Sequence, residues 1–298
     1  MLHHLHLLKK FLEFLVTNHI LLITKCKEKF KKVGQFMQLK IACIQLDIIY
    51  GNPEKNKQNA ELEISKVVSE SKPDVIVLPE LWTTGYDLTR LEDIADHQGA
   101  DTTQFIGTLS KKFSVNIVAG SVAKKTEKGV KNTMLIFNRN GEVIGEYSKL
   151  HLFKLMDEHH YLIPGDAKGL FTIEGVPSSG VICYDIRFPE WIRAHTTEGA
   201  ELVFVVAEWP LPRLEHWRAL LISRAIENQC YVVACNRAGS DPANVFAGHS
   251  MIIDPWGEII AEASTEPEVL TASIDLDQVK KVRKQIPIFQ DRRPSFYQ

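Results

Sequence analysis

From residue 39 onward the chain alternates short β-rich runs with helical segments, and this order constrains its fold more than any other feature. The run Asp-Val-Ile-Val-Leu at 74–78 is typical of a buried strand. Asn52 followed by Pro53 indicates a helix start, because asparagine caps the first turn and proline suits its first position. No repeat, low-complexity tract or linker interrupts residues 38–280. The pattern predicts one α/β domain there, with the antiparallel pairing of an α+β protein.

The expected elements follow from apolar period, helix caps and turn residues. Strands are expected at 39–46, 74–78, 115–122, 133–138, 142–147, 180–183, 201–207, 231–235, 249–253, 258–261 and 269–276. Helices are expected at 52–71, at 103–113, after Pro189 and at 213–228. Asn140-Gly141 predicts a two-residue hairpin turn between 133–138 and 142–147.

Charge and cysteine content exclude several classes of protein. The chain has 35 Lys+Arg against 37 Asp+Glu, so it lacks the basic surface of a nucleic-acid-binding protein. With 45% hydrophobic and 24% charged residues it is neither collagen-like nor disordered. Five cysteines without a CxxC spacing favour a reducing compartment, so we expect a cytoplasmic protein without disulfides. The histidines show no HExxH spacing, and we expect no metal and no cofactor.

Residues 1–37 differ from the rest of the chain. The first 36 carry seven lysines and two glutamates, and without them the formal charge falls from −2 to −7. Their most apolar stretch, 11–23, is too short and too interrupted for a membrane span. No small-residue cleavage site follows it. We interpret residues 1–37 as a basic extension of unknown role, with an amphipathic helix on a membrane surface as the alternative.

Three expected strands end on residues that could act together as a thiol hydrolase. Glu80 follows the run at 74–79, Lys149 closes the second hairpin strand and Cys183 closes Gly-Val-Ile-Cys. Reactive groups gather where buried strands of α/β folds end. A thiol with a reference pKa of roughly 8.5 needs a base or a positive field to act as a nucleophile. A carboxylate can take its proton, and an ammonium can stabilise both the thiolate and an oxyanion.

Each of these residues also has a structural interpretation. A cysteine in a buried strand is commonly a small core residue. A glutamate after a strand is commonly a solvated loop acid, and a lysine there an edge charge. Because 69 and 34 residues separate the three, spacing alone leaves both interpretations open.

The segments around these residues resemble the nitrilase superfamily of carbon–nitrogen hydrolases, and the resemblance runs from about residue 39 to 297. It rests on Leu-Pro-Glu at 78–80 with Gly-Tyr at 85–86, on Tyr-Ser-Lys-Leu-His-Leu-Phe at 147–153 and on Cys-Tyr-Asp-Ile-Arg-Phe-Pro-Glu at 183–190. Within the superfamily the chain is most similar to the ω-amidase branch, which hydrolyses the terminal amide of 2-oxoglutaramate and 2-oxosuccinamate. The stretches 224–229, 248–250, 254–257 and 286–289 support this branch.

The resemblance implies a four-layer α-β-β-α sandwich, usually paired into homodimers, and makes the tail at 281–298 a candidate for the dimer interface. It implies Glu80 as general base, Lys149 as oxyanion-stabilising cation and Cys183 as nucleophile, acting through a thioester. Counting six residues back from Pro-Gly-Asp at 164–166 gives Glu158 as the family's second glutamate. The alternative for Glu158 is a solvated loop acid.

The remaining expectations concern the substrate. The backbone N–H of Tyr184 would be the second oxyanion donor. Arg187 and Arg213 are candidates for binding a remote carboxylate, although they could equally be structural arginines. Aromatic residues that could wall the pocket or belong to the core are Phe153, Tyr86, Trp82 and Trp209. His159-His160 is expected at the polar surface or the pocket rim.

Other functions stay open on the same scaffold. A nitrilase, a carbamoyl-amino-acid amidohydrolase or an aliphatic amidase would use the same three residues. An acyltransferase would pass the thioester to an amine. A binding protein without turnover would have no need of this combination.

Overall fold

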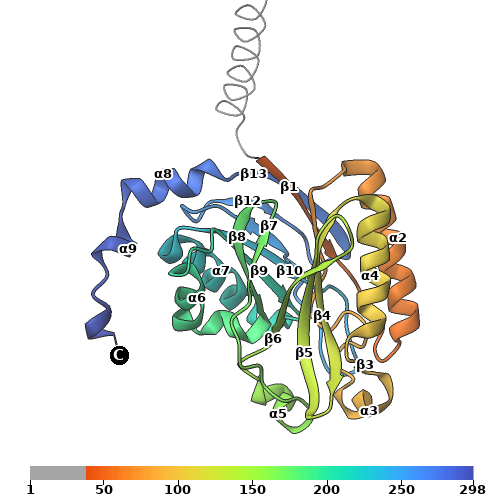
Figure 1. Ribbon diagram of the computed structural model, residues 1–298. Helices are drawn as coiled ribbons and strands as arrows, with labels where there is room; N and C mark the ends of the chain where they lie inside the picture. Colours follow the sequence, from red (N-terminus) through yellow and green to blue (C-terminus); the bar gives the residue numbers. More distant parts are fainter. Residues whose placement is uncertain (1–37, 298) are drawn as a thin grey trace, which may run out of the picture. The chain divides into compact units, whose positions relative to one another are not determined.

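The computed structural model describes residues 38–297, so the interpretation of residues 1–37 as a basic extension lies outside it. Two β-sheets form the centre of the fold (Figure 1). The first has the order β13-β1-β2-β4-β5-β6, with β3 paired to β4. Its strands are β1 (Gln38–Gln45), β2 (Val75–Val77), β3 (Asp96–His97), β4 (Asn116–Thr126), β5 (Gly129–Phe137), β6 (Val143–Ser148) and β13 (Glu268–Asp275).

The second sheet has the order β12-β11-β10-β9-β8-β7. Its strands are β7 (Leu170–Ile173), β8 (Val176–Ile182), β9 (Leu202–Ala207), β10 (Tyr231–Asn236), β11 (Met251–Ile253) and β12 (Ile259–Glu262). In both sheets three central strands run parallel and the strands beside them pair antiparallel, whereas the short β3 pairs parallel with β4. The mixed pairing agrees with the expected α+β character.

Helices cover the outer face of each sheet (Figure 1). The longer ones are α2 (Pro53–Ser71), α4 (Ala100–Phe113), α6 (Pro189–Thr196), α7 (Leu214–Asn228) and α8 (Asp277–Gln285). Short helical turns complete the chain: η1 (Leu88–Arg90), α3 (Leu91–Ile94), η2 (Lys154–Met156), α5 (Glu158–Tyr161), η3 (Cys183–Arg187), η4 (Leu211–Arg213), α9 (Ile288–Asp291) and η5 (Pro294–Phe296). The expected four-layer α-β-β-α sandwich is confirmed.

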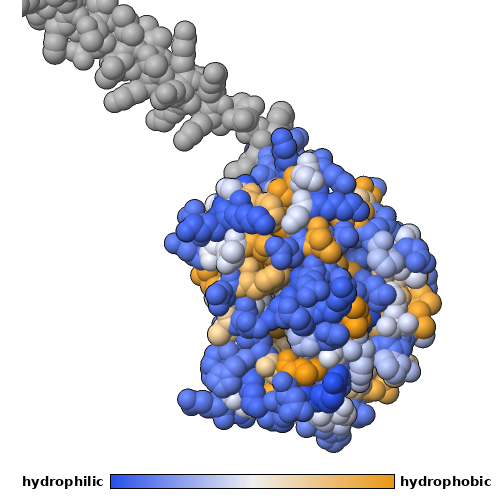
Figure 2. All heavy atoms as spheres, turned by 90° about the vertical axis from the view of Figure 1, so that its right-hand side faces the viewer, coloured by the Kyte–Doolittle hydropathy of each residue, from blue (hydrophilic) through white to orange (hydrophobic). Residues whose placement is uncertain are grey.

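The period of the strands explains the layers. In β1, Ile41 and Cys43 belong to the core between the sheets, whereas Ala42 and Ile44 belong to the core under α2 and α4. Alternate side chains of a strand face opposite sides, so a strand buried on both faces is apolar throughout. The side of the molecule where α2 and α4 lie is mainly hydrophilic in Figure 2. No helix within residues 38–297 is long and apolar enough to span a bilayer.

The expected elements all occur, with ends shifted by a few residues, whereas β3, β7 and α8 were not expected. Three differences concern the hairpins and the cysteine turn. The hairpin loop after β5 has three residues instead of two, because Asn138 N–H bonds to Glu142 O and Gly141 takes a φ of 83° in the loop. β4 and β5 extend to a second hairpin at 126–129, beyond the expected strand ends. β8 ends at Ile182, one residue before Cys183.

Candidate active site

The structure brings together the ends of β2, β6 and β8, and with them three of the predicted site residues. Glu80 lies just after β2, Lys149 follows β6 and Cys183 follows β8. Lys149 Nζ is 2.8 Å from Glu80 Oε1, and the side chains of Glu80 and Lys149 are fully buried. Glu158, the first residue of α5, is also fully buried, with Oε1 2.6 Å from Lys149 Nζ. The ammonium is therefore held between two carboxylates.

Cys183 lies on a sharp turn between β8 and η3. Its φ of 44° is a strained value for a residue with a side chain. The carboxylate of Asp185 stabilises the turn by accepting hydrogen bonds from Ile182 N at 3.1 Å, His151 N at 3.0 Å and Tyr147 Oη at 2.7 Å. Because residues 147 and 151 flank Lys149, one carboxylate connects the cysteine turn to the lysine segment.

The Glu80 carboxylate is fixed by donors on both oxygens. Oε1 accepts from Asn132 Nδ2 and from Lys149 Nζ, each at 2.8 Å. Oε2 accepts from the backbone N–H of Glu208 at 2.8 Å. A carboxylate held in this way is positioned in advance to exchange a proton with a neighbouring thiol.

Burial sets the protonation states of the thiol and the ammonium. It raises the pKa of the Cys183 thiol well above its usual value, Glu80 raises it further, and Lys149 only partly opposes them. The resting cysteine is thus a neutral thiol, and the positive field of Lys149 does not produce a free thiolate. Burial also disfavours the charge on Lys149, but Glu158 and Glu80 outweigh it and hold the Lys149 pKa well above its usual value.

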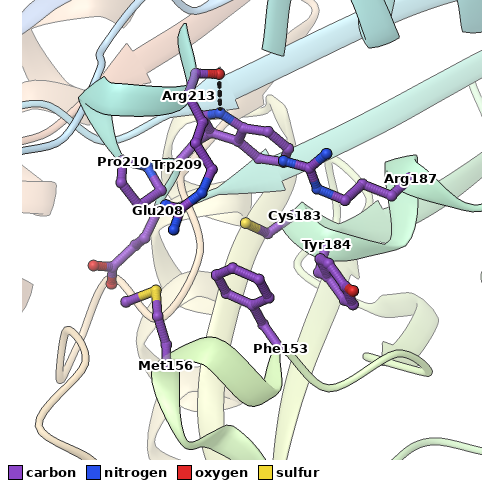
Figure 3. Close-up of a pocket in the computed structure, with 9 residues that line it drawn as sticks. All are labelled: Phe153, Met156, Cys183, Tyr184, Arg187, Glu208, Trp209, Pro210 and Arg213. Atoms are coloured by element: carbon purple, nitrogen blue, oxygen red, sulfur yellow. Dashed lines mark hydrogen bonds between the residues drawn. The ribbon is translucent and has the colours of Figure 1, made fainter. Parts of the chain in front are cut away.

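A small pocket of about 250 Å³ opens beside Cys183 (Figure 3). Its lining residues are Phe153, Met156, Cys183, Tyr184, Arg187, Glu208, Trp209, Pro210 and Arg213. The four predicted substrate-binding residues Tyr184, Arg187, Phe153 and Trp209 all belong to it, as does Arg213. Tyr184 is the second residue of η3, a position whose backbone N–H has no acceptor within its own helix.

Two guanidinium groups in this pocket rest on aromatic rings. Arg187 lies 4.7 Å from the Trp209 ring and Arg213 lies 5.5 Å from the Phe153 ring. Among residues 38–297, neither forms an ion pair with a carboxylate, and Arg213 lowers the pKa of Arg187 in addition to the effect of burial. Two cations without acidic partners in a small pocket are suited to binding an anion.

Two of the suggested aromatic walls lie elsewhere. Trp82 belongs to the core under α2 and α4, where its Nε1 donates to Ala119 O at 2.7 Å, so of the two alternatives for Trp82 the core position is the observed one. Tyr86 donates to Glu158 Oε1 at 2.6 Å and thus orders the carboxylates. The side chain of an aromatic residue that follows a strand can point to either face of the sheet, and the sequence pattern does not determine which face.

His159 and His160 are exposed, as expected for a surface position. Together with exposed Asp157 they place potential ligand atoms within 4.8 Å of one another. None of the three lines the pocket beside Cys183.

Three pocket residues were missed from the sequence, namely Met156, Pro210 and Glu208, and Glu208 is the charged one. Glu208 is fully buried and follows β9 directly. Its Oε2 accepts a hydrogen bond from Arg237 Nη1 at 2.9 Å. The signal that identified Glu80, an acid directly after a buried strand, applies equally to Glu208.

The fold and this site define the class of the protein: an α-β-β-α sandwich carrying a buried carboxylate, ammonium and thiol at its strand ends. The sequence model of the carbon-nitrogen hydrolase family matches residues 40–284. The chain belongs to this family.

Relatives and solved structures agree with the assignment. The chain is similar to the 2-oxoglutaramate amidase of Bacillus subtilis, with 55% identity over 88% of this chain and 100% of that protein. It is also similar to an omega-amidase of Escherichia coli K12, with 35% identity over 85% of this chain and 96% of that one. A crystal structure of a carbon-nitrogen hydrolase superfamily protein from Xanthomonas campestris superimposes with a TM-score of 0.80 at 29% identity, covering 86% and 97% of the two chains.

Proposed function

We propose that the protein is an ω-amidase that hydrolyses the terminal amide of 2-oxoglutaramate to 2-oxoglutarate and ammonia. The similarity to the Bacillus subtilis 2-oxoglutaramate amidase along its whole length supports this activity. The observation that carries the proposal is the buried group of Glu80, Lys149 and Cys183 beside a small pocket with two guanidinium groups that form no ion pair within residues 38–297. The three buried groups suit amide hydrolysis, and the two guanidinium groups suit binding of a carboxylate at the far end of the substrate.

In the first half-reaction, Glu80 removes the thiol proton as Cys183 Sγ attacks the amide carbonyl carbon. The neutral resting thiol requires that proton transfer accompany the attack. Lys149 and the backbone N–H of Tyr184 stabilise the oxyanion, and one such donor can contribute about 3–4 kcal/mol. Protonated Glu80 then gives its proton to the leaving nitrogen, which departs as ammonia and leaves a thioester.

In the second half-reaction, Glu80 activates a water molecule that attacks the thioester carbonyl. The tetrahedral intermediate collapses with release of the carboxylic acid, and the proton returns to the Cys183 thiol. We assign Glu158 a positioning role, because its Oε1 lies 2.6 Å from Lys149 Nζ and its Oε2 accepts from Phe153 N at 2.7 Å. These contacts hold the ammonium next to the reacting carbonyl.

Arg187 and Arg213 are proposed to bind the remote carboxylate. Stacking on Trp209 and Phe153 keeps the two planar groups in place. Arg187 Nη2 lies 3.4 Å from His216 Nδ1, and its other N–H groups are proposed to bind the ligand. This explains why a small amide that also carries a carboxylate suits the pocket better than a simple aliphatic amide.

The experiment is an ammonia-release assay with a substrate panel. We expect hydrolysis of 2-oxoglutaramate and 2-oxosuccinamate and far slower reaction with glutamine, carbamoyl-β-alanine and simple nitriles. Fast turnover of one of the latter group instead would assign the protein to another activity of the family.

A second test concerns the nucleophile. Cys183→Ala should abolish ammonia release while leaving thermal unfolding near that of the wild type, because the side chain removed is small. Mass spectrometry after mixing with a slow amide should find the acyl adduct on Cys183. The matched control is Cys235→Ala, which removes a buried thiol of β10 that does not line the pocket. Undiminished turnover by Cys183→Ala would overturn the mechanism.

Two further proposals complete this function. We propose a homodimer, supported by exposed apolar side chains near the C-terminal end of α7, among them Ile226 at 50% exposure. We also propose a cytoplasmic location, since the four cysteines of the described chain are free thiols.

A further inference from the structure

Glu208 lies between the general base and the substrate pocket. Its backbone N–H donates to Glu80 Oε2 at 2.8 Å, and its side chain lines the same pocket as Cys183 (Figure 3). The side chain is fully buried. Burying a carboxyl group without hydrogen-bond partners lowers the stability of the fold, so both of its oxygens are expected to have a partner.

The two carboxyl oxygens of Glu208 have different surroundings. Oε2 accepts a hydrogen bond from Arg237 Nη1 at 2.9 Å, whereas Oε1 has no partner within residues 38–297. Arg237 cannot turn to serve both oxygens, because Nη2 donates to Ile48 O at 2.8 Å and Nε to Ala238 O at 3.1 Å. Oε1 is therefore the one polar atom of this buried pair that is left for a ligand.

We propose that Glu208 selects 2-oxo acids by donating a hydrogen bond from its protonated Oε1 to the 2-oxo oxygen of the substrate. This inference rests on the function proposed above and names the residue that sets its substrate class.

The hydrogen-bonding needs of the substrate lead to this assignment. Its amide oxygen is taken by Lys149 and the Tyr184 amide, and its carboxylate by the two arginines. The 2-oxo oxygen is an acceptor and needs one more donor. Glu208 is the only lining side chain with a carboxyl group, and a protonated carboxyl supplies that donor. The α-ammonium of an amino-acid amide would meet a donor and two cations there, and would be rejected.

The protonation state agrees with this role. Burial raises the pKa of Glu208 to about 8, against the opposing effect of Arg237 and with Glu80 adding to the rise. Arg237 donates to Oε2, so the proton belongs on Oε1. The titratable and charged groups that face Glu208 or share its pocket are Arg237, Glu80, Asp241, Tyr86, Cys183, Arg187 and Arg213. Above a pH of about 8 the carboxyl loses the hydrogen and repels the carboxylate of the substrate.

The test compares kcat/KM for 2-oxoglutaramate with that for glutaramate, which has a methylene in place of the 2-oxo group. For the wild type we expect a ratio of about tenfold or more at pH 7, from one hydrogen bond in a buried site. The ratio should fall as the pH rises past 8. Taking the ratio cancels ionisations that affect both substrates, including those of Cys183 and Lys149.

Glu208→Gln is the decisive variant, because its amide can accept from Arg237 and donate from the position of Oε1 without titrating. It should keep the ratio at pH 7 and lose the fall at higher pH. Both enzymes meet the same solution forms of the substrate, so the difference between them belongs to residue 208. Glu208→Ala should bring the ratio close to one, and its thermal unfolding shows whether the loss of the Arg237 partner disturbs the fold. Glu258→Gln, which makes the same change at an exposed glutamate outside the pocket, is the matched control and should behave as the wild type.

The outcomes separate the two proposals. A wild type that hydrolyses neither amide would overturn the proposed function and this inference with it. Hydrolysis of both with a ratio near one, or the same pH-dependent fall in Glu208→Gln and wild type, would overturn the role of Glu208 alone.

Discussion

At the scale of single residues, Glu158 is the clearest case of a side chain that acts through another. Replacing it with glutamine keeps its shape but removes one of the two negative charges beside Lys149. A lost charge-assisted hydrogen bond corresponds to about 1.5–3 kcal/mol. We therefore expect kcat of Glu158→Gln to fall about 10- to 100-fold with little change in KM, measured by steady-state ammonia release.

Asp157→Asn is the matched control for this variant, because Asp157 is adjacent but exposed. Its left-handed φ of 58° suits asparagine, so the fold should be unaffected. A wild-type kcat in Glu158→Gln would make Glu158 an ordinary structural acid. Equal losses in both variants would point to a disturbed loop.

The sequence predicted more about the reacting residues than about their surroundings. Glu80, Lys149 and Cys183 each stand at a strand end, where sequence and resemblance agree. The sequence left Trp82 open between pocket and core, because the period of a strand does not extend into the turn after it. Arg237 was missed because its hydrogen bonds depend on Glu208 and on Asp47 and Ile48, which follow β1 and lie far away in sequence.

At the scale of elements, Asp185 is the carboxylate that connects β8 and η3 to the lysine segment after β6. In Asp185→Asn, a side-chain amide donor would replace one oxygen that accepts hydrogen bonds from Ile182, His151 or Tyr147. We expect the free energy of unfolding to fall by roughly 1–3 kcal/mol and kcat to fall with it, since Cys183 depends on this turn. Urea unfolding and kinetics on the same preparation measure both.

Tyr147→Phe is the comparison, because it removes one donor to Asp185 together with the acceptor of Leu150 N and Trp191 Nε1 but keeps the bonds from Asp185 to Ile182 and His151. It should lower the free energy of unfolding by roughly 1–3 kcal/mol with a smaller fall in kcat than Asp185→Asn. Unchanged stability in Asp185→Asn would mean that the turn is held by its packing instead.

The elements themselves were largely predictable, and the exceptions have physical causes. Apolar runs identify the central strands, because a strand that is buried on both faces is apolar throughout. The Asn52 cap identifies the start of α2. The loop between β5 and β6 was misjudged by one residue, since Asn-Gly also fits a three-residue loop with glycine at positive φ. The extension of β4 past residue 122 contains Lys124 and Lys125, whose pairing with β5 gives no apolar signal.

At the scale of the whole molecule, the four layers were predictable for two reasons. The apolar strands require both sheets to be buried, and the resemblance to the nitrilase superfamily implies the α-β-β-α order. Pairing with a second copy follows less directly from the sequence, since it depends on which outer face stays apolar. The face over α2 and α4 is mainly hydrophilic in Figure 2. At the C-terminal end of α7, Ile226 instead lies next to Gly257. Gln229, which follows α7, donates from Nε2 to Ile286 O at 2.7 Å, and the Ile286 side chain is 45% exposed.

This distribution predicts that the dimer forms through α7, and that Ile226→Asp converts it to a monomer. A carboxylate buried without a partner in an interface costs several kcal/mol, more than a moderate dimer can absorb. Light scattering coupled to size-exclusion chromatography measures the mass directly. Leu62→Asp places the same charge on α2, where the side chain is 67% exposed, and should leave the dimer intact. A monomeric wild type would refute the dimer, whereas a dimer that survives Ile226→Asp and dissociates with Leu62→Asp would move the interface to the opposite layer.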